Sequence, residues 1–458
     1  MGSWEDYLAY NEKQYLEELI DFLKIPSISS LSEHAGDVAT AADWVATRME
    51  RAGMDGVRVM PTGGHPVVYG EWLRSGDKPT VMIYGHFDTQ PADPLDLWTT
   101  PPFEPTIRDK RVYARGASDD KGNMLAAIIG VEALLKSQEN LPVNIKMFFE
   151  GQEEILSPQL PDFINTQKDL LSCDLILSAD GGQWDREQPN IILGLRGSCA
   201  LQIDVQGANT DVHSGMYGGA IHNPIHALTE IVGSMHSTDG RILVKGFYDM
   251  VKQTVDEEKR LYESIPYDES EFKNKLKLDD LHGEPGYSTY ERMWVRPTVE
   301  VNGIWGGFQG EGTKTVIPNQ AHAKISCRLV PDQDPEKILE LVISHVENYA
   351  PKGVKVTTQP YKSTADPYLI PHDHLGNQAA HTVHKALYGK DPYYTRVGGS
   401  VPICAIFQKT LGVHTVIFAF GTSENNVHAP DEFFDLEDFA LAQKAYAMIL
   451  NELSDRIF

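Results

Sequence analysis

The first part of the chain alternates short apolar runs with segments of helical periodicity. Residues 81–84, 145–149 and 175–177 are apolar runs of strand length, and residues 11–23 and 37–49 carry apolar side chains at helical spacing. Between the first two runs, Met124, Ile128, Val131 and Leu135 predict an amphipathic helix. Strands that alternate with helices indicate an α/β domain with a mostly parallel sheet and helices on both faces.

The middle of the chain has a different pattern. Residues 200–205 and 323–328 alternate apolar and polar side chains, which is typical of half-exposed strands in an antiparallel sheet. Residues 250–285 between them are densely charged and predict a solvated helical insertion. Beyond residue 366 the α/β pattern returns, with an apolar run at 413–420 and a terminal helix at 436–453. We therefore expect an α/β domain formed by residues 1–198 and 366–458, interrupted by a smaller α+β domain at 199–365.

Composition and charge exclude some classes of partner. The 458 residues include 65 acidic and 40 basic side chains, a formal net charge of −25. That charge argues against nucleic acid and against an anionic membrane surface, which both recruit clustered Lys and Arg. The four cysteines are dispersed and read as reduced thiols, the N-terminus is polar, and no apolar run approaches the ~18 residues of a membrane span. We expect a cytoplasmic protein.

Candidate chemistry lies where the apolar runs end. A His-Phe-Asp segment follows the run at 81–84, a Glu-Glu pair follows 145–149, an Asp follows 175–177, and a His follows 413–420 after a polar loop. An Asp-Asp pair opens the helix that contains Met124. Ligands of open α/β sheets bind beyond the carboxyl ends of the strands, so we expect these side chains to share one crevice. They are His86, Asp88, Asp119, Glu153, Glu154, Asp180 and His428.

Each of these motifs alone has an ordinary structural explanation. A lone His-x-Asp is most often incidental, a Glu-Glu pair is usually a solvated face, and an Asp-Asp turn is usually a helix cap. Together they favour a metal site, and imidazole with carboxylate ligands suits Zn²⁺, Mn²⁺ or Co²⁺ better than Ca²⁺ or Cu⁺. The ligands exceed what one tetrahedral zinc ion needs, which predicts two metal ions that share a carboxylate.

Other motifs do not compete with this interpretation. Residues 307–315 nearly spell a phosphate-binding loop, but Thr313 separates the second Gly from Lys314 and no helix is expected to follow. The sequence has no Gly-x-Ser-x-Gly elbow of a serine hydrolase. The turn Gly398-Gly399-Ser400 has two equally favoured interpretations. Its backbone amides bind an anion, or it is only a tight turn.

The sequence resembles the M20 family of metallopeptidases, in the branch of cytosolic nonspecific dipeptidases and carnosinase-like enzymes. The resemblance extends from the first helix beyond His428 and is carried by seven motifs in order. They are Tyr84-Gly85-His86-Phe87-Asp88-Thr89-Gln90-Pro91, Arg115-Gly116-Ala117-Ser118-Asp119-Asp120-Lys121-Gly122, Glu150-Gly151-Gln152-Glu153-Glu154, Asp211-Val212-His213-Ser214-Gly215, Lys314-Thr315-Val316-Ile317-Pro318, Arg328-Leu329-Val330-Pro331 and Gly398-Gly399-Ser400-Val401-Pro402.

This resemblance implies two divalent metal ions per subunit, with zinc first and manganese or cobalt as substitutes. His86 and Asp180 would bind one ion, Glu154 and His428 the other, and Asp119 would bridge them through a cis peptide to Asp120. The implied catalytic residues are Asp88, which would orient His86, and Glu153, the general base that deprotonates the attacking water and then protonates the leaving amine.

The resemblance also assigns roles outside the α/β domain. The inserted domain would act as a lid and mediate homodimerisation, so that His213 reaches a partner's active site as an oxyanion donor. The substrate's carboxylate would be received by Arg328, Thr315, Gly399 and Ser400, and His374 is a further candidate without a motif. One departure concerns residues 155 and 156, where this chain has Ile and Leu and the family usually has small residues.

These features predict a binuclear metal hydrolase that cleaves the amide bond of dipeptides or similar small aminoacyl substrates. One alternative is a deacylase of N-acyl or N-carbamoyl amino acids, because the same metal core serves both reactions. A second alternative, from another class, is a noncatalytic metal- or peptide-binding protein of the same fold. Glu153 argues against the binding protein, because a binder needs no base beside its ligands.

Overall fold

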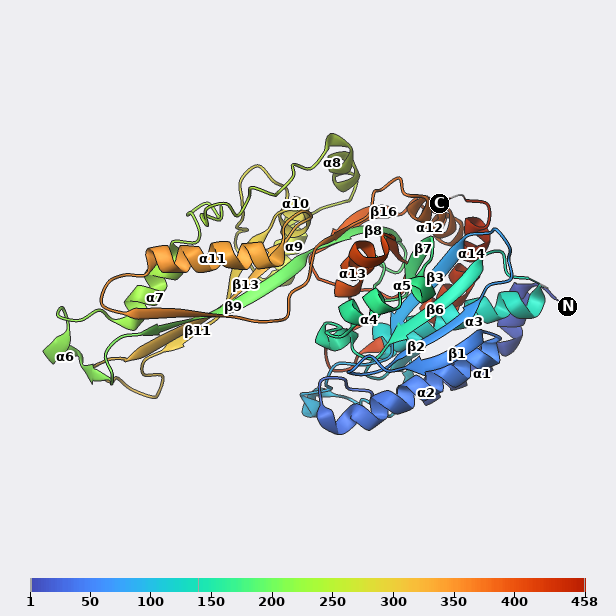
Figure 1. Cartoon of the computed structure of the whole chain (residues 1–458), viewed down its shortest axis with the longest axis horizontal. Coiled ribbons are helices and arrows are strands. Elements are labelled where there is room, and N and C mark those ends of the chain that lie inside the picture. Colours follow the sequence, from blue (N-terminus) through green and yellow to red (C-terminus); the bar gives the residue numbers. More distant parts are fainter. Residues whose placement is uncertain (1, 139, 457) are drawn as a thin grey trace. The chain divides into compact units, whose positions relative to one another are not determined.

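The chain divides into two compact units. The computed structural model describes residues 2–138, 140–456 and 458 (Figure 1). The first unit contains Met1–Leu193, Ile370–Thr395 and Ile403–Phe458, and the second contains Gly194–Leu369 and Arg396–Pro402. The sequence placed the borders at 198/199 and 365/366 and did not predict that residues 396–402 return to the second unit. Each unit is therefore built from segments that are distant in the sequence.

The first unit contains a sheet with the strand order β1-β2-β6-β3-β7-β17. Its strands are β1 (Asp55–Met60), β2 (Val67–Trp72), β3 (Thr80–His86), β6 (Asn144–Glu150), β7 (Leu175–Ser178) and β17 (Thr415–Ile417). Strands β6, β3, β7 and β17 pair in parallel, and β1 and β2 add an antiparallel edge. The mostly parallel α/β sheet is confirmed, although the apolar run at 413–420 is a strand only at 415–417.

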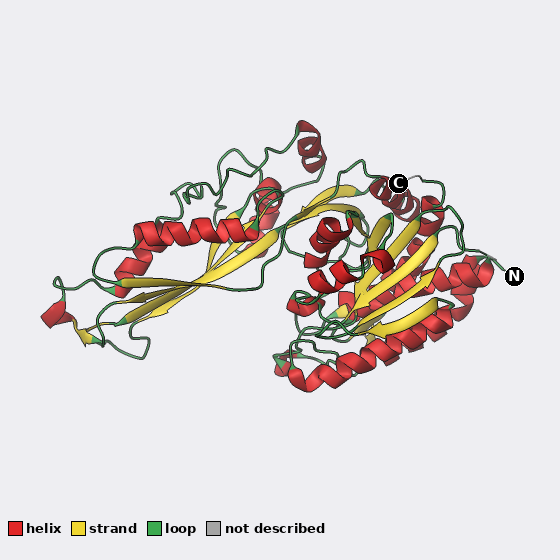
Figure 2. Ribbon diagram, in the orientation of Figure 1, coloured by secondary structure: helices red, strands yellow, loops and turns green. Residues whose placement is uncertain are grey.

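Helices cover both faces of this sheet (Figure 2). They are α1 (Trp4–Leu23), α2 (Ala35–Ala52), α3 (Gly122–Ser137), α4 (Leu160–Thr166), α5 (Lys168–Leu171), α12 (Leu375–Tyr388), α13 (Pro402–Leu411) and α14 (Leu436–Leu453). On one face, Phe163 of α4 and Phe407 of α13 lie against Phe148 of β6. On the other face, α2 and α3 pack on β2 and β3. Successive residues of a strand point to opposite faces, so both faces must be apolar to hold these helices.

Helix α3 is not amphipathic, contrary to the sequence prediction. Leu125 and Ile129, which lie off the predicted apolar stripe, are fully buried, whereas Leu135 of that stripe is only half-buried. The reason is that α3 contacts α1, α2 and α14 as well as the sheet. A helix enclosed on all sides needs apolar or small residues all round.

Two small sheets accompany the central one. Strands β4 (Thr106–Arg108), β5 (Arg111–Tyr113) and β18 (Phe433–Asp435) form one, and β8 (Asn190–Leu195), β15 (Tyr368–Leu369) and β16 (Tyr393–Val397) form the other. Within the first, β18 pairs with β5, so residues just after His428 lie beside residues just before Asp119. This pairing links two segments that carry candidate metal ligands.

The second unit is built on an antiparallel sheet with the order β11-β13-β9-β14. Its strands are β9 (Gly197–Gln206), β11 (Thr298–Gly306), β13 (Gln320–Leu329) and β14 (Lys355–Pro360), and a short ladder joins β10 (Val212–His213) to β12 (Val316–Ile317). Residues along β9 are alternately buried and half-exposed, as the sequence predicted. The buried side chains pack against α7 (Pro224–Gly233) and α11 (Pro335–Tyr349).

The remaining helices of this unit are short. They are α6 (Ser214–Tyr217), α8 (Asp256–Glu263), α9 (Glu269–Leu276) and α10 (Thr289–Trp294). Helices α8 and α9 form the charged insertion that the sequence predicted at 250–285.

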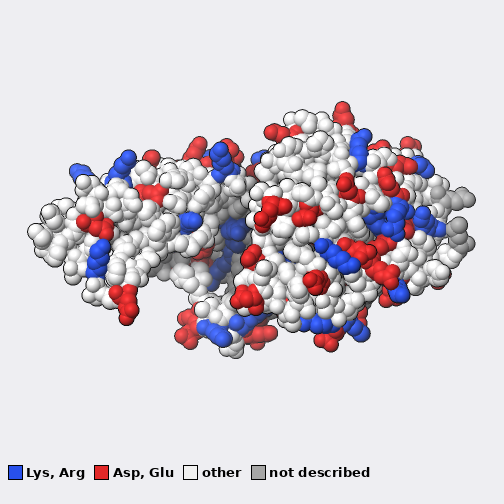
Figure 3. All heavy atoms as spheres, turned by 90° about the horizontal axis from the view of Figure 1, so that it is seen from below, with Lys and Arg blue, Asp and Glu red and all other residues white. Residues whose placement is uncertain are grey.

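Acidic and basic side chains are interspersed over the face shown in Figure 3. Among the described residues, no helix is both long enough and apolar enough to cross a bilayer.

Candidate active site

The parallel strands bring the polar residues of the sequence motifs to one edge of the sheet. His86 is the last residue of β3 and lies opposite Glu150, the last residue of β6. Ser178 ends β7 beside Tyr84, so Asp180 follows at the same edge. Parallel pairing places the carboxyl ends of the strands together, which is why segments 86–88, 153–154 and 180 converge although up to 94 residues separate them.

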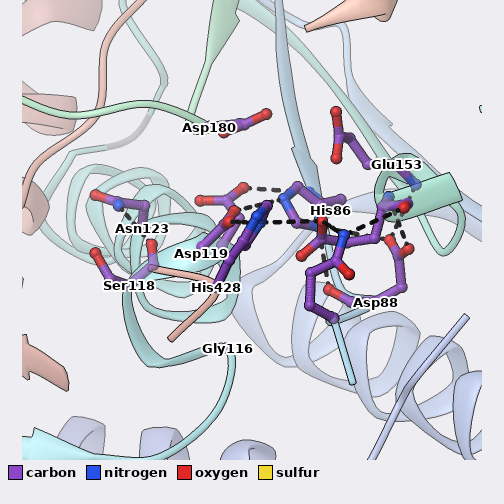
Figure 4. A network of polar contacts seen from close by, with 12 residues as sticks. His86, Asp88, Gly116, Ser118, Asp119, Asn123, Glu153, Asp180 and His428 are labelled. Carbon is purple, nitrogen blue, oxygen red and sulfur yellow. Dashed lines mark hydrogen bonds and ion pairs between the residues drawn. The ribbon is translucent and has the colours of Figure 1, made fainter. Parts of the chain in front are cut away.

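Two groups of possible metal ligands meet at this edge and share one carboxylate (Figure 4). The first group is His86, Asp119 and Asp180, and the second is Asp119, Glu154 and His428. His86 Nε2 lies 3.0 Å from Asp119 Oδ1, while His428 Nε2 lies 3.0 Å from Asp119 Oδ2 and 3.2 Å from Glu154 Oε2. Asp119 therefore presents one carboxylate oxygen to each group. Its peptide bond to Asp120 is cis.

Asp88 acts on more of the site than the sequence indicated. His86 Nδ1 lies 3.1 Å from the backbone oxygen of Asp88 and 3.5 Å from its carboxylate. The two carboxylate oxygens of Asp88 accept hydrogen bonds from the backbone N–H groups of Glu153 and Glu154, each at 3.1 Å. The buried Asp88 side chain thus holds the turn that presents both glutamates as well as contacting the ring of His86.

Glu153 stands beside the two groups without belonging to either. It begins a short 3-10 turn, Glu153–Ile155, directly after β6. Burial, and next the nearby Asp180 carboxylate, raise the pKa of Glu153 well above its usual range. A carboxyl with a raised pKa is suited to accept and return a proton near neutral pH.

The electrostatics of the site favour bound cations. The pKa of Asp180 is raised to about 7, mainly by burial; His86 opposes this rise, and the carboxylates of Asp119 and Glu154 contribute to it. Several carboxylates in a buried place repel one another, and divalent cations offset that repulsion. Two imidazoles and three carboxylates are also a donor set for borderline metals such as zinc. The residues therefore fit two divalent metal ions. His428 has a side chain that is 53% exposed, against 4% for Glu154, so the second group is open on the His428 side.

Gln90, which the sequence placed in the first motif without a role, contacts the second ligand group. Its side-chain nitrogen donates a hydrogen bond of 2.8 Å to Glu154 Oε2. Gln90 belongs to the segment that follows β3, and its position two residues after Asp88 was the available signal. Of the bulky residues after Glu154, Ile155 is half-buried and Leu156 is exposed.

In the second unit, Arg328 and the Gly398-Gly399-Ser400 turn lie together. Arg328 Nη1 donates a hydrogen bond of 3.2 Å to Ser400 Oγ. The same turn is held by Arg196, a residue that the sequence did not single out, whose Nε donates to Gly398 O at 3.1 Å. A Cβ on Gly398 would lie 2.8 Å from Arg196 Nη2, so a larger residue there would displace the end of the Arg196 side chain. Burial, with Arg328 as the second cause, lowers the pKa of Arg196 to about 10. Two guanidinium groups beside an amide-rich turn suit a carboxylate.

His213 and Thr315 lie together elsewhere in the same unit. His213 pairs with Val316 in the β10–β12 ladder, and Ser214 N donates to Thr315 O at 3.1 Å. This ladder continues the β9–β13 pair beyond Gln320, whereas Arg328 lies near the other end of β13. The nine residues from Gln320 to Arg328 alone span about 26 Å. Within one chain, Thr315 is therefore far from Arg328.

His374 is not part of either metal group. It caps the start of α12 by accepting a hydrogen bond from Gly376 N, and its ring centroid lies 5.0 Å from that of His414. Burial lowers the pKa of His374 to about 4. The assignment of His374 to the substrate's carboxylate stays a prediction.

Comparisons with known proteins identify the family of the chain. Residues 82–452 match the peptidase family M20/M25/M40. The chain is 31% identical over 461 residues to a Cys-Gly metallodipeptidase of Schizosaccharomyces pombe, covering 96% of each chain. It is 30% identical over 464 residues to the Beta-Ala-His dipeptidase of Homo sapiens, covering 98% of this chain and 92% of the relative.

A solved structure extends the similarity to the fold. The structure of an M20 family metallo-carboxypeptidase from Sulfolobus solfataricus superposes with a TM-score of 0.85 at 32% identity, covering 96% of this chain and 99% of the other. The predicted resemblance and the predicted class of enzyme are confirmed. The chain therefore belongs to peptidase family M20/M25/M40, as a metallopeptidase that uses divalent metal ions.

Proposed function

We propose that this protein is a dipeptidase with two metal ions in each active site. The observation that carries the proposal is the pair of ligand groups that share Asp119, one carboxylate oxygen facing each group. Similarity to two dipeptidases over nearly the whole chain supports a dipeptide as the substrate.

The metal ligands follow from the two groups. His86 and Asp180 would hold one ion, Glu154 and His428 would hold the other, and Asp119 would be shared by both. When bound, divalent ions in such a pair polarise the scissile carbonyl and make water a stronger nucleophile. Zinc is the first choice of metal, because the donors are imidazoles and carboxylates, and manganese or cobalt are the substitutes.

Glu153 is the general base in this proposal. It takes a proton from the attacking water and transfers it to the amine that leaves. Asp88 supports both functions, because its carboxylate holds the backbone of Glu153 and its main chain contacts the ring of His86. The position of the base thus depends on the buried side chain of Asp88, and the orientation of His86 depends mainly on the backbone oxygen of the same residue.

Arg328, Gly399 and Ser400 receive the carboxylate of the substrate. The contact between Arg328 and Ser400, with Arg196 behind the turn, supports this assignment. An arginine recognises a carboxylate through two parallel hydrogen bonds, and the backbone of a glycine-rich turn adds further donors.

The distance between Arg328 and Thr315 supports a shared active site. A dipeptide in an extended conformation is about 7 Å long, so it cannot contact both residues of the same chain. His213 and Thr315 can reach a substrate held by Arg328 only if they come from a second copy. We therefore keep the homodimer with shared active sites as part of the proposal.

The edge of the second unit's sheet offers a surface for the second copy. In the described strand order β11 lies at the edge, with unpaired backbone groups along it. Val301, Ile304 and Trp305 of this strand are 41%, 52% and 38% exposed. Two copies that pair along β11 would form the two-fold symmetric contact that most homodimers have.

The alternatives are not favoured. The similar proteins at 30–32% identity are peptidases, which argues against a deacylase and against a noncatalytic binder. For the location we keep the cytoplasm as a prediction, since Cys173, Cys199, Cys327 and Cys404 are all free thiols.

Removal of the metal ions tests the proposed function. Dialysis against a chelator should abolish hydrolysis of a panel of dipeptides, and Zn²⁺ or Mn²⁺ should restore it, because the carboxylates and imidazoles of the site have no other way to activate water. The measurement is release of free amino acid, with metal content determined in the same samples. Full activity in a preparation without metal would exclude the proposal. The panel includes N-acetylated dipeptides and N-acyl amino acids, because a carboxypeptidase or a deacylase would prefer these.

Replacing Arg328 with Lys should raise KM more than it lowers kcat. Lysine keeps the charge but loses the planar fork, and a charge-assisted hydrogen bond contributes about 1.5–3 kcal/mol, so kcat/KM should fall roughly 10- to 100-fold. Dipeptide amides, which lack the carboxylate, should lose much less. Arg260→Lys, at an exposed position of α8, is the control. Equal losses for dipeptides and their amides would show that Arg328 does not bind the carboxylate.

A further inference from the structure

A buried carboxylate outside both metal groups lies under the loop that presents Asp119. Glu432 is 1% exposed and comes four residues after His428. Its backbone oxygen accepts a hydrogen bond of 3.0 Å from Ala114 N, which places it beside the segment that leads to Asp119. The sequence around Glu432 gave no indication that this residue has a role in the candidate site.

Four donors converge on the Glu432 carboxylate. Arg115 Nη1 donates to Oε2 at 2.8 Å, and the backbone N–H of Gly116 donates to the same oxygen at 2.9 Å. Ser118 N and Asp119 N donate to Oε1 at 3.0 and 3.2 Å. Three of these donors are backbone amides of one short loop, and the last of them belongs to the bridging residue itself. Gly116, Ser118 and Asp119 are seen along this loop in Figure 4.

The pattern of donors exceeds what charge compensation requires. Arg115 is 1% exposed and needs a buried anion, and Glu432 supplies it. A counterion alone would not need the amides of Gly116, Ser118 and Asp119. A carboxylate that accepts several backbone hydrogen bonds fixes the course of that backbone. The course of residues 116–119 sets the direction from which the Asp119 side chain reaches His86 and His428.

We propose that Glu432 is a positioning residue for the metal centre, which acts by holding the amides of residues 116–119 so that Asp119 can bridge two metal ions. Because Glu432 and His428 lie in one segment, Glu432 also ties the His428 loop to the Asp119 loop. This inference rests on the proposed function, in which Asp119 and His428 are metal ligands. Groups that orient metal ligands typically affect metal affinity by 10- to 100-fold.

The test measures zinc affinity rather than activity. Zn²⁺ binding by the full chain is titrated against a competing chelator, and thermal unfolding is recorded without metal. Glu432→Gln keeps the size of the side chain but turns a donor toward the loop, so zinc affinity should fall about 10- to 100-fold. An unchanged affinity would overturn the inference. If Glu432→Gln does not fold, Glu432→Asp replaces it, because the shorter side chain cannot reach all three amides. The expected loss of zinc affinity is the same, and an unchanged affinity would again overturn the inference.

Glu132 provides a matched control. It is a buried carboxylate of the same unit, paired with the buried Arg48 at 2.5 Å, and it makes no described contact with residues 116–119. Glu132→Gln should lower the unfolding temperature as Glu432→Gln does, yet leave zinc affinity within about two-fold of wild type. If Glu132→Gln weakened zinc binding as much as Glu432→Gln, general destabilisation would explain both and the inference would be wrong.

A double variant separates positioning from charge compensation. In Glu432→Gln with Arg115→Met, both buried charges are removed, which often restores stability. Zinc affinity should stay low, because Gln keeps only one of the two acceptor oxygens and still turns an N–H donor toward the loop amides. Recovery of zinc affinity in the double variant would show that Glu432 is only the counterion of Arg115. A wild-type chain that binds no zinc would instead contradict the proposed function, and the inference with it.

Discussion

Glu153→Gln should lower kcat by about 100- to 10,000-fold while the metal content stays near that of the wild type. Glu153 belongs to neither ligand group, and its turn is held by Asp88 through the backbone, so the amide should leave the site assembled. Only the proton transfer is lost. Because the chemical step alone is impaired, KM should change little and kcat/KM should fall with kcat. The measurements are steady-state kinetics and elemental analysis of the same preparation.

Glu154→Gln is the matched comparison, because the two residues are neighbours in the same turn. Glu154 Oε2 lies 3.2 Å from His428 Nε2 and belongs to the second ligand group. An amide is a poorer ligand than a carboxylate for zinc, so this variant should lose metal occupancy as well as activity. If Glu153→Gln lost metal and Glu154→Gln kept it, the roles of base and ligand would be reversed.

A mixture of two inactive variants, Glu153→Gln and His213→Ala, should recover roughly a quarter of the wild-type activity. If His213 serves the partner's site, the subunit that retains Glu153 in a mixed dimer receives an intact His213, and one of two sites is complete. Random reassortment makes half of the dimers mixed, which gives about a quarter of the sites. The two variants are co-expressed, mixed dimers are identified by mass, and dipeptide hydrolysis is measured.

The local geometry of His213 is suited to donating a hydrogen bond to the oxyanion of the substrate. Its Nδ1 accepts a hydrogen bond of 3.0 Å from Gly215 N, so the neutral ring carries its proton on Nε2. That proton is available to a developing oxyanion, and removing such a donor typically costs about 100- to 1,000-fold in kcat. Absence of recovery in confirmed mixed dimers would show that His213 acts within its own subunit or only caps the start of α6.

The pattern of apolar and polar residues along the chain was sufficient to predict most strands and helices of the first unit and the edge of the sheet where the candidate site lies. The apolar runs at 81–84, 145–149 and 175–177 became β3, β6 and β7, and the terminal helix lies at 436–453 as predicted. Strand periodicity and run length are properties of adjacent residues, so they can be read without the fold. The convergence of His86, Glu154, Asp180 and His428 could be predicted because the carboxyl ends of parallel strands share an edge, and Asp119 precedes the helix that connects β3 to β6.

Only the tertiary structure decided which groups hold the candidate metal ligands and the base in place. It also decided how far apart the candidate substrate-binding residues lie. Asp88 meets Glu153 across 65 residues and Glu432 meets Asp119 across 313, and neither contact has a local signature. The enclosure of α3 on all sides and the separation of Thr315 from Arg328 likewise depend on packing and on strand register. A sequence shows which side chains are available at the ends of its elements. Burial and hydrogen bonding between distant segments select the partners, because they depend on the complete fold.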